Sequence, residues 1–166
     1  MKKIMLMSLV VLTAFSFCSD AQTPRSPRVS AEGKDVKVSY GQPSKRDREI
    51  FGGLVPYGQV WRTGANKATE ITFAKDVKVA GKDLKAGTYT LFTIPAEKEW
   101  TIILNSQLDQ PGAFDYEKNK SKDVLHVKVP AKKIDNSVEA LTYRFDGNNN
   151  LVIEWDKTQV AVPISR

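Results

Sequence analysis

The chain has 166 residues, 25 of them Lys or Arg and 19 Asp or Glu, and a formal net charge of +6 at pH 7. Its single cysteine and single histidine exclude an internal disulfide and a zinc or copper site built from several such ligands. Because the charges of both signs are mixed along the chain, we expect weak attraction to anionic surfaces and no nucleic-acid partner.

The first element is a short hydrophobic segment behind a basic start. Lys2 and Lys3 precede an apolar run over residues 4–17. A membrane-spanning helix needs about 20 apolar residues, so this run favours a secretory signal peptide and no transmembrane span. We place cleavage after Ala21, which makes residues 1–21 the signal peptide and the protein periplasmic or secreted.

A lipoprotein anchored through Cys18 is the alternative at this end. Lipoprotein processing requires a small residue before the cysteine, and Phe17 stands there. We therefore expect cleavage to remove the cysteine. The next residues, 22–28, are polar and contain two prolines, which indicates a flexible tether before a domain over residues 29–166.

From the tether onward, apolar and polar residues alternate with the period of two that is typical of β-strands. The pattern predicts about nine short strands separated by turn residues, and no long helix, because no stretch sustains helical spacing. We therefore predict an all-β fold, a single antiparallel β-sandwich, with a jelly roll as one option. The expected strands are centred on residues 36–40, 71–73, 77–79, 87–95, 100–104, 125–129, 141–145, 151–155 and 160–164.

Two features refine the predicted sheet. Residues 87–95 are apolar on both faces of an extended chain, which predicts a central strand covered on two sides and ended by Pro95. Four aromatic residues lie on the same face of their predicted strands as aliphatic neighbours, so we expect them in the core. They are Trp100, Tyr143, Phe145 and Trp155.

Most polar groups outside these strands have ordinary structural interpretations. His126 alternates with Leu125 and Val127, so we expect it on the surface. The segment from Asp146 to Asn150 reads DGNNN and lies between two apolar strands, which favours a hairpin turn over a calcium loop. We expect no metal site and no cofactor, since nucleotide-binding glycine motifs are also missing.

The segment over residues 44–66 interrupts the alternation with glycines, charges and specific polar groups. Trp61 and Arg62 are adjacent, so in an extended chain their side chains point to opposite faces. Arginine is suited to binding carboxylate or phosphate, and loops on a rigid sheet commonly carry function. The candidate ligand-binding residues in and beside this segment are Tyr57, Trp61, Arg62, Asn66 and Glu70.

A structural interpretation of this segment stays open beside the functional one. Trp61 would then close one end of the sandwich, Arg62 would form an ion pair with Glu70 or Asp47, and Asn66 would close a turn.

Three stretches carry a resemblance to a known family. They read IFGGLVPYGQVWRTGANKATEI, LKAGTYTLFTIP and EWTIILN. Together they resemble the family described as domain of unknown function 2911, over about residues 28–164. The resemblance implies an exported, β-rich domain and implies no activity, substrate or catalytic residue. Family members often carry a tryptophan before the glycine of the loop near residues 109–114, where this chain has Pro111.

The sequence favours a non-enzymatic exported module that binds a small anionic or carbohydrate ligand, or an envelope protein partner. The alternative is a hydrolase acting on envelope glycans or esters. In that alternative Arg62 holds the substrate, and the base is Glu70 or an aspartate from residues 109–117. The catalytic residues stay unassigned. The two hypotheses differ in whether a carboxylate lies beside Arg62.

Overall fold

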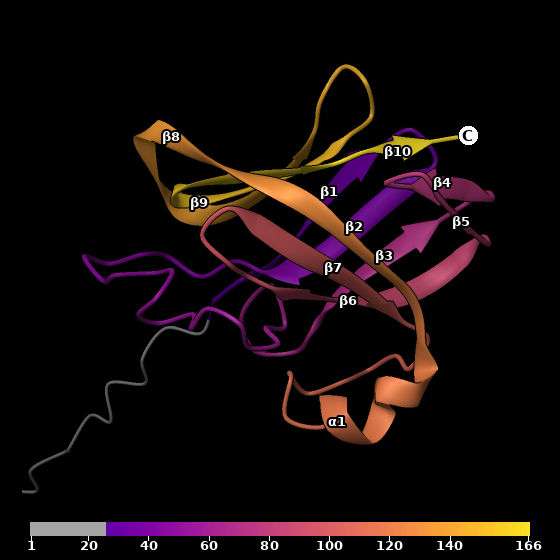
Figure 1. Cartoon of the computed structure of the whole chain (residues 1–166), viewed down its shortest axis with the longest axis horizontal. Coiled ribbons are helices and arrows are strands. Elements are labelled where there is room, and N and C mark those ends of the chain that lie inside the picture. The colour runs from indigo at the N-terminus through magenta and orange to yellow at the C-terminus, as the bar shows by residue number, and fades with distance from the viewer. Residues whose placement is uncertain (1–25) are drawn as a thin grey trace, which may run out of the picture.

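The computed structural model describes residues 26–166, whose regular secondary structure is almost wholly β-strand (Figure 1). Seven strands form one antiparallel sheet in the order β1-β2-β3-β6-β7-β8-β9. Their bounds are β1 Arg28–Gly33, β2 Val36–Gly41, β3 Thr69–Phe73, β6 Gly87–Ile94, β7 Glu99–Asn105, β8 Asp123–Phe145 and β9 Leu151–Val162. A small sheet has the order β10-β4-β5, with β4 Val77–Val79, β5 Lys82–Leu84 and β10 Ile164–Ser165. The predicted all-β fold is confirmed.

The large sheet follows the chain as a meander. Each of its strands pairs with the next strand of this sheet along the chain, and β4 and β5 leave it between β3 and β6. This order differs from the two Greek keys of a jelly roll, the option that the sequence left open. Short turns join β1 to β2, β6 to β7 and β8 to β9, whereas residues 42–68 link β2 to β3 and residues 106–122 link β7 to β8.

The large sheet curves so that its two ends approach each other. In Figure 1, β8 and β9 pass across β1 and β2. The backbone N–H of Leu141 donates to Pro43 O at 2.9 Å and that of Lys45 donates to Glu139 O at 2.7 Å, which joins the segment after β2 to β8. The main core fills the interior, where Leu125, Ile153 and Val162 are buried as the alternation predicts.

The outer face of the sheet carries a second, smaller core. Phe92 and Ile103 pack there with Tyr116 of α1 (Tyr116–Asn119), which continues into a short 3-10 helix over Lys120–Lys122. Leu91, the neighbour of Phe92, belongs to the main core. The prediction that residues 87–95 form a strand covered on both faces is therefore confirmed, and β6 ends before Pro95 as expected.

Several strand boundaries differ from the prediction. β1 and the short β5 were not predicted, and β1 begins at Arg28, the last residue of the expected tether. The expected strands at 125–129 and 141–145 are one bent strand, β8, which pairs with β7 up to Pro130 and with β9 from Ala131. Exposed polar residues between them concealed this continuity, and the register with β9 is interrupted there, between Lys133 and Val138 and between Val138 and Thr142.

Other local expectations are confirmed. Trp100, Tyr143 and Trp155 are buried and Phe145 is partly buried against the core. The DGNNN segment is the turn between β8 and β9, where Asp146 accepts hydrogen bonds from the backbone N–H groups of Asn148 and Asn150. The predicted signal peptide, its cleavage site and Cys18 fall within residues 1–25, outside the described residues, and stay predictions.

Candidate functional site

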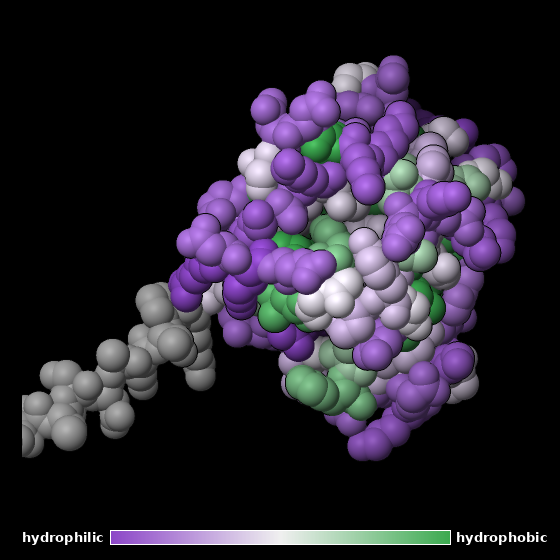
Figure 2. All heavy atoms as spheres, turned by 60° about the vertical axis from the view of Figure 1, so that its left-hand side comes forward, coloured by the Kyte–Doolittle hydropathy of each residue, from purple (hydrophilic) through white to green (hydrophobic). Residues whose placement is uncertain are grey.

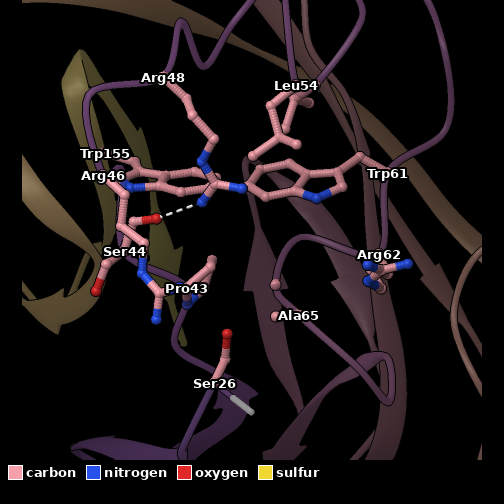
Figure 3. A pocket seen from close by; sticks show the side chains of 12 residues that line it. Ser26, Pro43, Ser44, Arg46, Arg48, Leu54, Trp61, Arg62, Ala65 and Trp155 are labelled. Atoms are coloured by element: carbon pink, nitrogen blue, oxygen red, sulfur yellow. Dashed lines mark hydrogen bonds between the residues drawn. The ribbon is translucent and has the colours of Figure 1, made fainter. Parts of the chain in front are cut away.

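A pocket of about 440 Å³ opens at the end of the molecule where the loop over residues 42–68 leaves the sheet (Figure 3). One wall is the segment 43–48, the other is the segment 61–65, and β9 contributes from behind. We call it the tryptophan–arginine pocket. Its lining is Ser26, Pro43, Ser44, Arg46, Arg48, Leu54, Val55, Trp61, Arg62, Gly64, Ala65 and Trp155.

Two indole rings belong to the apolar part of this pocket, together with Pro43, Leu54, Val55 and Ala65. The backbone of Trp61 pairs with Thr93 of β6 in both directions, at 2.8 and 3.0 Å, which fixes the ring over the main core. Trp155 comes from β9, and its Nε1 donates to Glu139 O at 3.1 Å. The two rings are nearly parallel, at 15°, with centroids 6.0 Å apart. Trp155 is buried and Trp61 is partly exposed, so it is the face of Trp61 that can pack against the ring of a ligand.

Arginine side chains supply the charge. Arg48 donates to the carbonyl oxygens of Ser44, at 2.6 Å, and Lys45, at 2.9 Å, and its guanidinium projects between the two indoles in Figure 3. Carbonyl oxygens orient a guanidinium without neutralising it. Arg46 lies on the same wall, and no Asp or Glu belongs to the described lining. The pocket therefore carries a positive potential that attracts anions.

Arg62 lies at the edge of the pocket, beyond Ala65 in Figure 3. Its guanidinium also reaches the outer face of the sheet, since a Cβ placed on Gly112 would lie 3.4 Å from Nη1. The Nε atom is buried and has no hydrogen-bond partner among the described residues. No ion pair of Arg62 with Glu70 or Asp47 is found within residues 26–166, so the pairing expected in the structural interpretation is not formed.

Buried hydroxyl groups of Tyr143 and Thr69 hold the loop over residues 62–66 in place. Tyr143 donates to Thr63 O at 2.6 Å, and Thr69 donates to the same oxygen at 2.9 Å. Thr63 itself has a φ of 51°, in the left-handed region, and its hydroxyl bonds Thr93 Oγ1 at 3.0 Å. Burial raises the pKa of Tyr143 well above its ordinary value, which keeps the phenol protonated as a donor.

The five candidate residues from the sequence are not all brought together. Trp61 and Arg62 line the tryptophan–arginine pocket. Tyr57 is 41% exposed and lines a different pocket. Asn66 is exposed, has a φ of 60° and donates to Ser26 O at 3.2 Å, and Glu70 accepts a hydrogen bond from the backbone of Asp109 at 3.0 Å.

Sequence reasoning missed Arg46, Arg48 and Trp155 as pocket residues. The basic run SKRDRE over residues 44–49 was a signal for the two arginines, but nothing in a linear sequence places them beside a tryptophan of β9.

The carboxylates considered for acid–base chemistry lie elsewhere. Asp109 forms an ion pair with Lys67, whose hydrogen bond and charge lower the pKa of Asp109. Asp115 pairs with Lys118 at 2.9 Å, and Glu117 lies 3.8 Å from Lys120. None of these carboxylates, and not Glu70, lines the tryptophan–arginine pocket.

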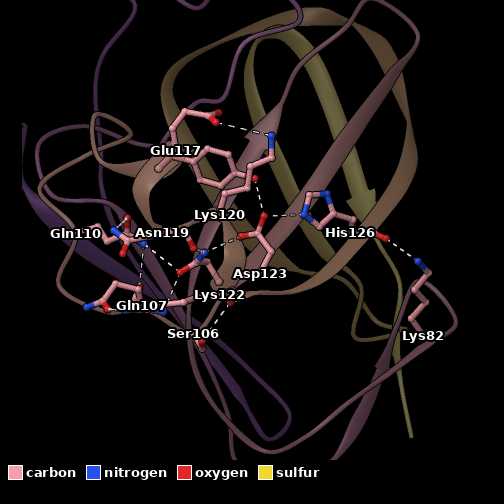
Figure 4. Close-up of polar contacts among 12 residues, drawn as sticks. Lys82, Ser106, Gln107, Gln110, Glu117, Asn119, Lys120, Lys122, Asp123 and His126 are labelled. Carbon is pink, nitrogen blue, oxygen red and sulfur yellow. Dashed lines mark hydrogen bonds and ion pairs between the residues drawn. The ribbon is translucent and has the colours of Figure 1, made fainter.

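A polar cluster surrounds one buried carboxylate where β7 ends and β8 begins (Figure 4). Asp123, with a side chain 7% exposed, accepts hydrogen bonds from Tyr116 Oη at 2.6 Å and Asn105 Nδ2 at 2.7 Å. His126 Nε2 lies 2.8 Å from the same carboxylate, and the ring is on the surface as predicted. The cluster fastens α1 and the 3-10 helix to the sheet, and no pocket opens beside it among those described.

The fold and pocket define an all-β protein with a cationic, tryptophan-lined pocket at one end. Residues 23–164 match the family model described as Protein of unknown function (DUF2911), so the chain belongs to this family. Comparison with curated proteins and with solved structures finds no match.

The described part of the chain lacks two further features. Within residues 26–166 no helix has the length and hydrophobicity that a membrane crossing requires. In the same range no three His, Cys, Asp or Glu side chains are grouped so that they could hold a metal ion.

Proposed function

We propose that this protein is a binding module for a small anionic ligand with a ring, such as an acidic or phosphorylated sugar, held in the tryptophan–arginine pocket. The carboxylate or phosphate pairs with Arg48 and Arg46, and the ring lies against the partly exposed Trp61, which Trp155 supports from the core. Arginine forms charge-assisted hydrogen bonds to such groups, and indole faces pack well against rings.

The observation that carries this proposal is the composition of the lining. Three arginines and two tryptophans line a volume of about 440 Å³, and no described carboxylate shares it. This volume lies within the usual range of small-molecule sites. Arg62 extends the cationic edge, and its buried Nε has no hydrogen-bond partner in the described chain.

The same observation favours binding over the hydrolase alternative. Hydrolysis of a glycoside in this pocket calls for a pair of carboxylates flanking the scissile bond. The lining offers none within the described residues, and Glu70 and Asp109 are engaged with other groups. Export to the periplasm or the exterior, and an envelope protein partner, remain part of the proposal on sequence grounds alone.

Calorimetric titration of the purified protein tests the proposed ligand class. We expect glucuronate and glucose 6-phosphate to bind and glucose to bind at least about tenfold more weakly, because a charge-assisted hydrogen bond contributes roughly 1.5–3 kcal/mol. Arg48→Gln should weaken binding of the two anions by about ten- to a hundredfold. Raising the salt concentration from about 20 to about 200 mM should weaken binding of the anions further.

The matched control is Lys34→Gln, which removes the same charge from an exposed residue outside this pocket and should leave the affinity unchanged. Equal affinity for glucose and glucuronate would assign the pocket to neutral carbohydrate. If Arg48→Gln bound the two anions as tightly as the unsubstituted protein, the tryptophan–arginine pocket would not be their binding site.

A further inference from the structure

Arg46 and Arg48 belong to one tight turn over residues 45–48, which we call the arginine turn. The backbone N–H of Arg48 donates to Lys45 O at 3.2 Å and closes it. The two central residues, Arg46 and Asp47, are exposed and have φ angles of 50° and 57°. The segment after β2 lies at the left of Figure 1. Figure 2 turns that side toward the viewer and shows hydrophilic residues around small hydrophobic patches, so the turn is at a polar surface that a ligand can reach.

The backbone of the arginine turn is strained. A turn with positive φ at both central residues is the kind that Asn-Gly favours, because most other residues adopt the left-handed region at a cost in free energy. Here the two positions hold an arginine and an aspartate. Strain of this kind persists only where the surrounding structure fixes the backbone, and it is concentrated at functional sites. A group outside the turn must therefore hold it in shape.

Glu139 of β8 supplies that group. Its carboxylate Oε1 accepts a hydrogen bond from the backbone N–H of Arg46 at 3.0 Å. Its carbonyl oxygen accepts one from the backbone N–H of Lys45 at 2.7 Å and another from Trp155 Nε1 at 3.1 Å. One residue of β8 thus contacts both the turn that carries the arginines and the indole of β9 in the same pocket.

An irregular stretch of β8 places Glu139 beside the turn. The register of β8 with β9 is interrupted between Val138 and Thr142, and Glu139 lies within this interruption. Its neighbour Ala140 pairs instead with Ser44, the residue just before the arginine turn. Irregularities of this kind commonly lie beside functional sites, where they redirect a side chain.

We propose that Glu139 is a positioning residue of the tryptophan–arginine pocket, whose carboxylate keeps the arginine turn in the conformation from which Arg46 and Arg48 bind the anionic group of the ligand. Glu139 does not belong to the lining, so it acts through the two arginines. The proposal rests on the anion binding proposed above.

The sign of a change in affinity separates this positioning role from a purely electrostatic one. A carboxylate near the pocket repels an anion, so removing its charge should by itself strengthen binding. Loss of the hydrogen bond to Arg46 should instead weaken binding, because the turn is then free to leave its strained conformation.

Calorimetric titration with glucuronate and glucose 6-phosphate measures that sign. Glu139→Ala should weaken binding about two- to tenfold, the range that corresponds to one intramolecular hydrogen bond. Glu139→Gln keeps an acceptor oxygen and loses the charge, so it should bind at least as tightly as the unsubstituted protein. Asp135→Ala is the control, because it removes a carboxylate from an exposed residue of the same strand outside the pocket and should not weaken binding.

A glycine in the turn should make the carboxylate of Glu139 dispensable. Asp47→Gly introduces a residue that adopts positive φ without strain, so the turn keeps its shape without this hydrogen bond. We expect Glu139→Ala/Asp47→Gly to bind the anions within about twofold of Asp47→Gly alone. Comparison with this single variant removes the effect of the lost charge of Asp47.

Three results would overturn this proposal alone, provided that binding still depends on Arg48. They are binding by Glu139→Ala as tight as that of the unsubstituted protein or tighter, an equal loss in Glu139→Gln and Glu139→Ala, and a loss in the double variant as large as that in Glu139→Ala. If the unsubstituted protein bound neither anion, the proposed function would fail and this proposal with it.

Discussion

At the scale of single residues, Asp123 shows how one carboxylate holds an end of the sheet. Its oxygens receive hydrogen bonds from Tyr116 and Asn105, and His126 lies beside them. Tyr116 in turn packs against Phe92 on the outer face. A buried acceptor with several donors is costly to remove, because its partners lose their hydrogen bonds and cannot reach water.

We therefore expect Asp123→Ala to lower the free energy of unfolding by roughly 3 kcal/mol, since it leaves the Tyr116 hydroxyl without its acceptor. Urea denaturation measures the change. Asp83→Ala is the control, because the side chain of Asp83 is 87% exposed and its ion pair with Lys78 is on the surface, so a change within about 0.5 kcal/mol is expected. Equal losses in both variants would contradict the structural role of Asp123.

At the scale of elements, the end of β2 and the loop over residues 62–66 approach each other closely. The backbone N–H of Ala65 donates to Gly41 O at 3.1 Å, and a Cβ placed on Gly41 would overlap the carbonyl oxygen of Ala65. Here a glycine is required by space and not by its φ angle. The contact places Gly64 and Ala65 in the wall of the tryptophan–arginine pocket.

Gly41→Ala should therefore destabilise the protein by about 1–3 kcal/mol, because two backbone segments must separate to admit one methyl group. Thermal denaturation by circular dichroism measures the loss. Gly147→Ala makes the same substitution in the turn between β8 and β9, where a Cβ meets no atom within 4 Å, and its effect should be small. If Gly41→Ala proved as harmless as Gly147→Ala, the close approach would be refuted.

At the scale of the whole molecule, buried phenols link stability to alkaline pH. Burial raises the pKa of Tyr40 and of Tyr143, and burial together with Asp123 raises that of Tyr116. The folded protein holds these protons at a pH where the unfolded chain, with an ordinary tyrosine pKa near 10, releases them. The stabilisation is thus complete below about pH 10 and is lost as the pH rises above that value.

Tyr116→Phe tests this linkage. Each such tyrosine steepens the fall in the free energy of unfolding by at most about 1.4 kcal/mol per pH unit above pH 10. We expect Tyr116→Phe to show a shallower fall than the unsubstituted protein when urea denaturation is repeated at several pH values from about 9 to 11. Lysines also titrate in this range, but they contribute equally to both proteins. Parallel curves would argue against the raised pKa.

The sequence by itself determined the all-β class, the buried aromatic positions, the burial of β6 on both faces and the turn at Asp146. Each of these depends on neighbours along the chain. It also pointed to Trp61 and Arg62. Only the tertiary structure decided that Arg48 and Trp155 share their pocket, that Tyr57 belongs to another, and that β8 is one bent strand. The reason is physical: the curvature of a sheet and the pairing of its distant strands depend on packing between residues far apart in sequence, which local alternation does not encode.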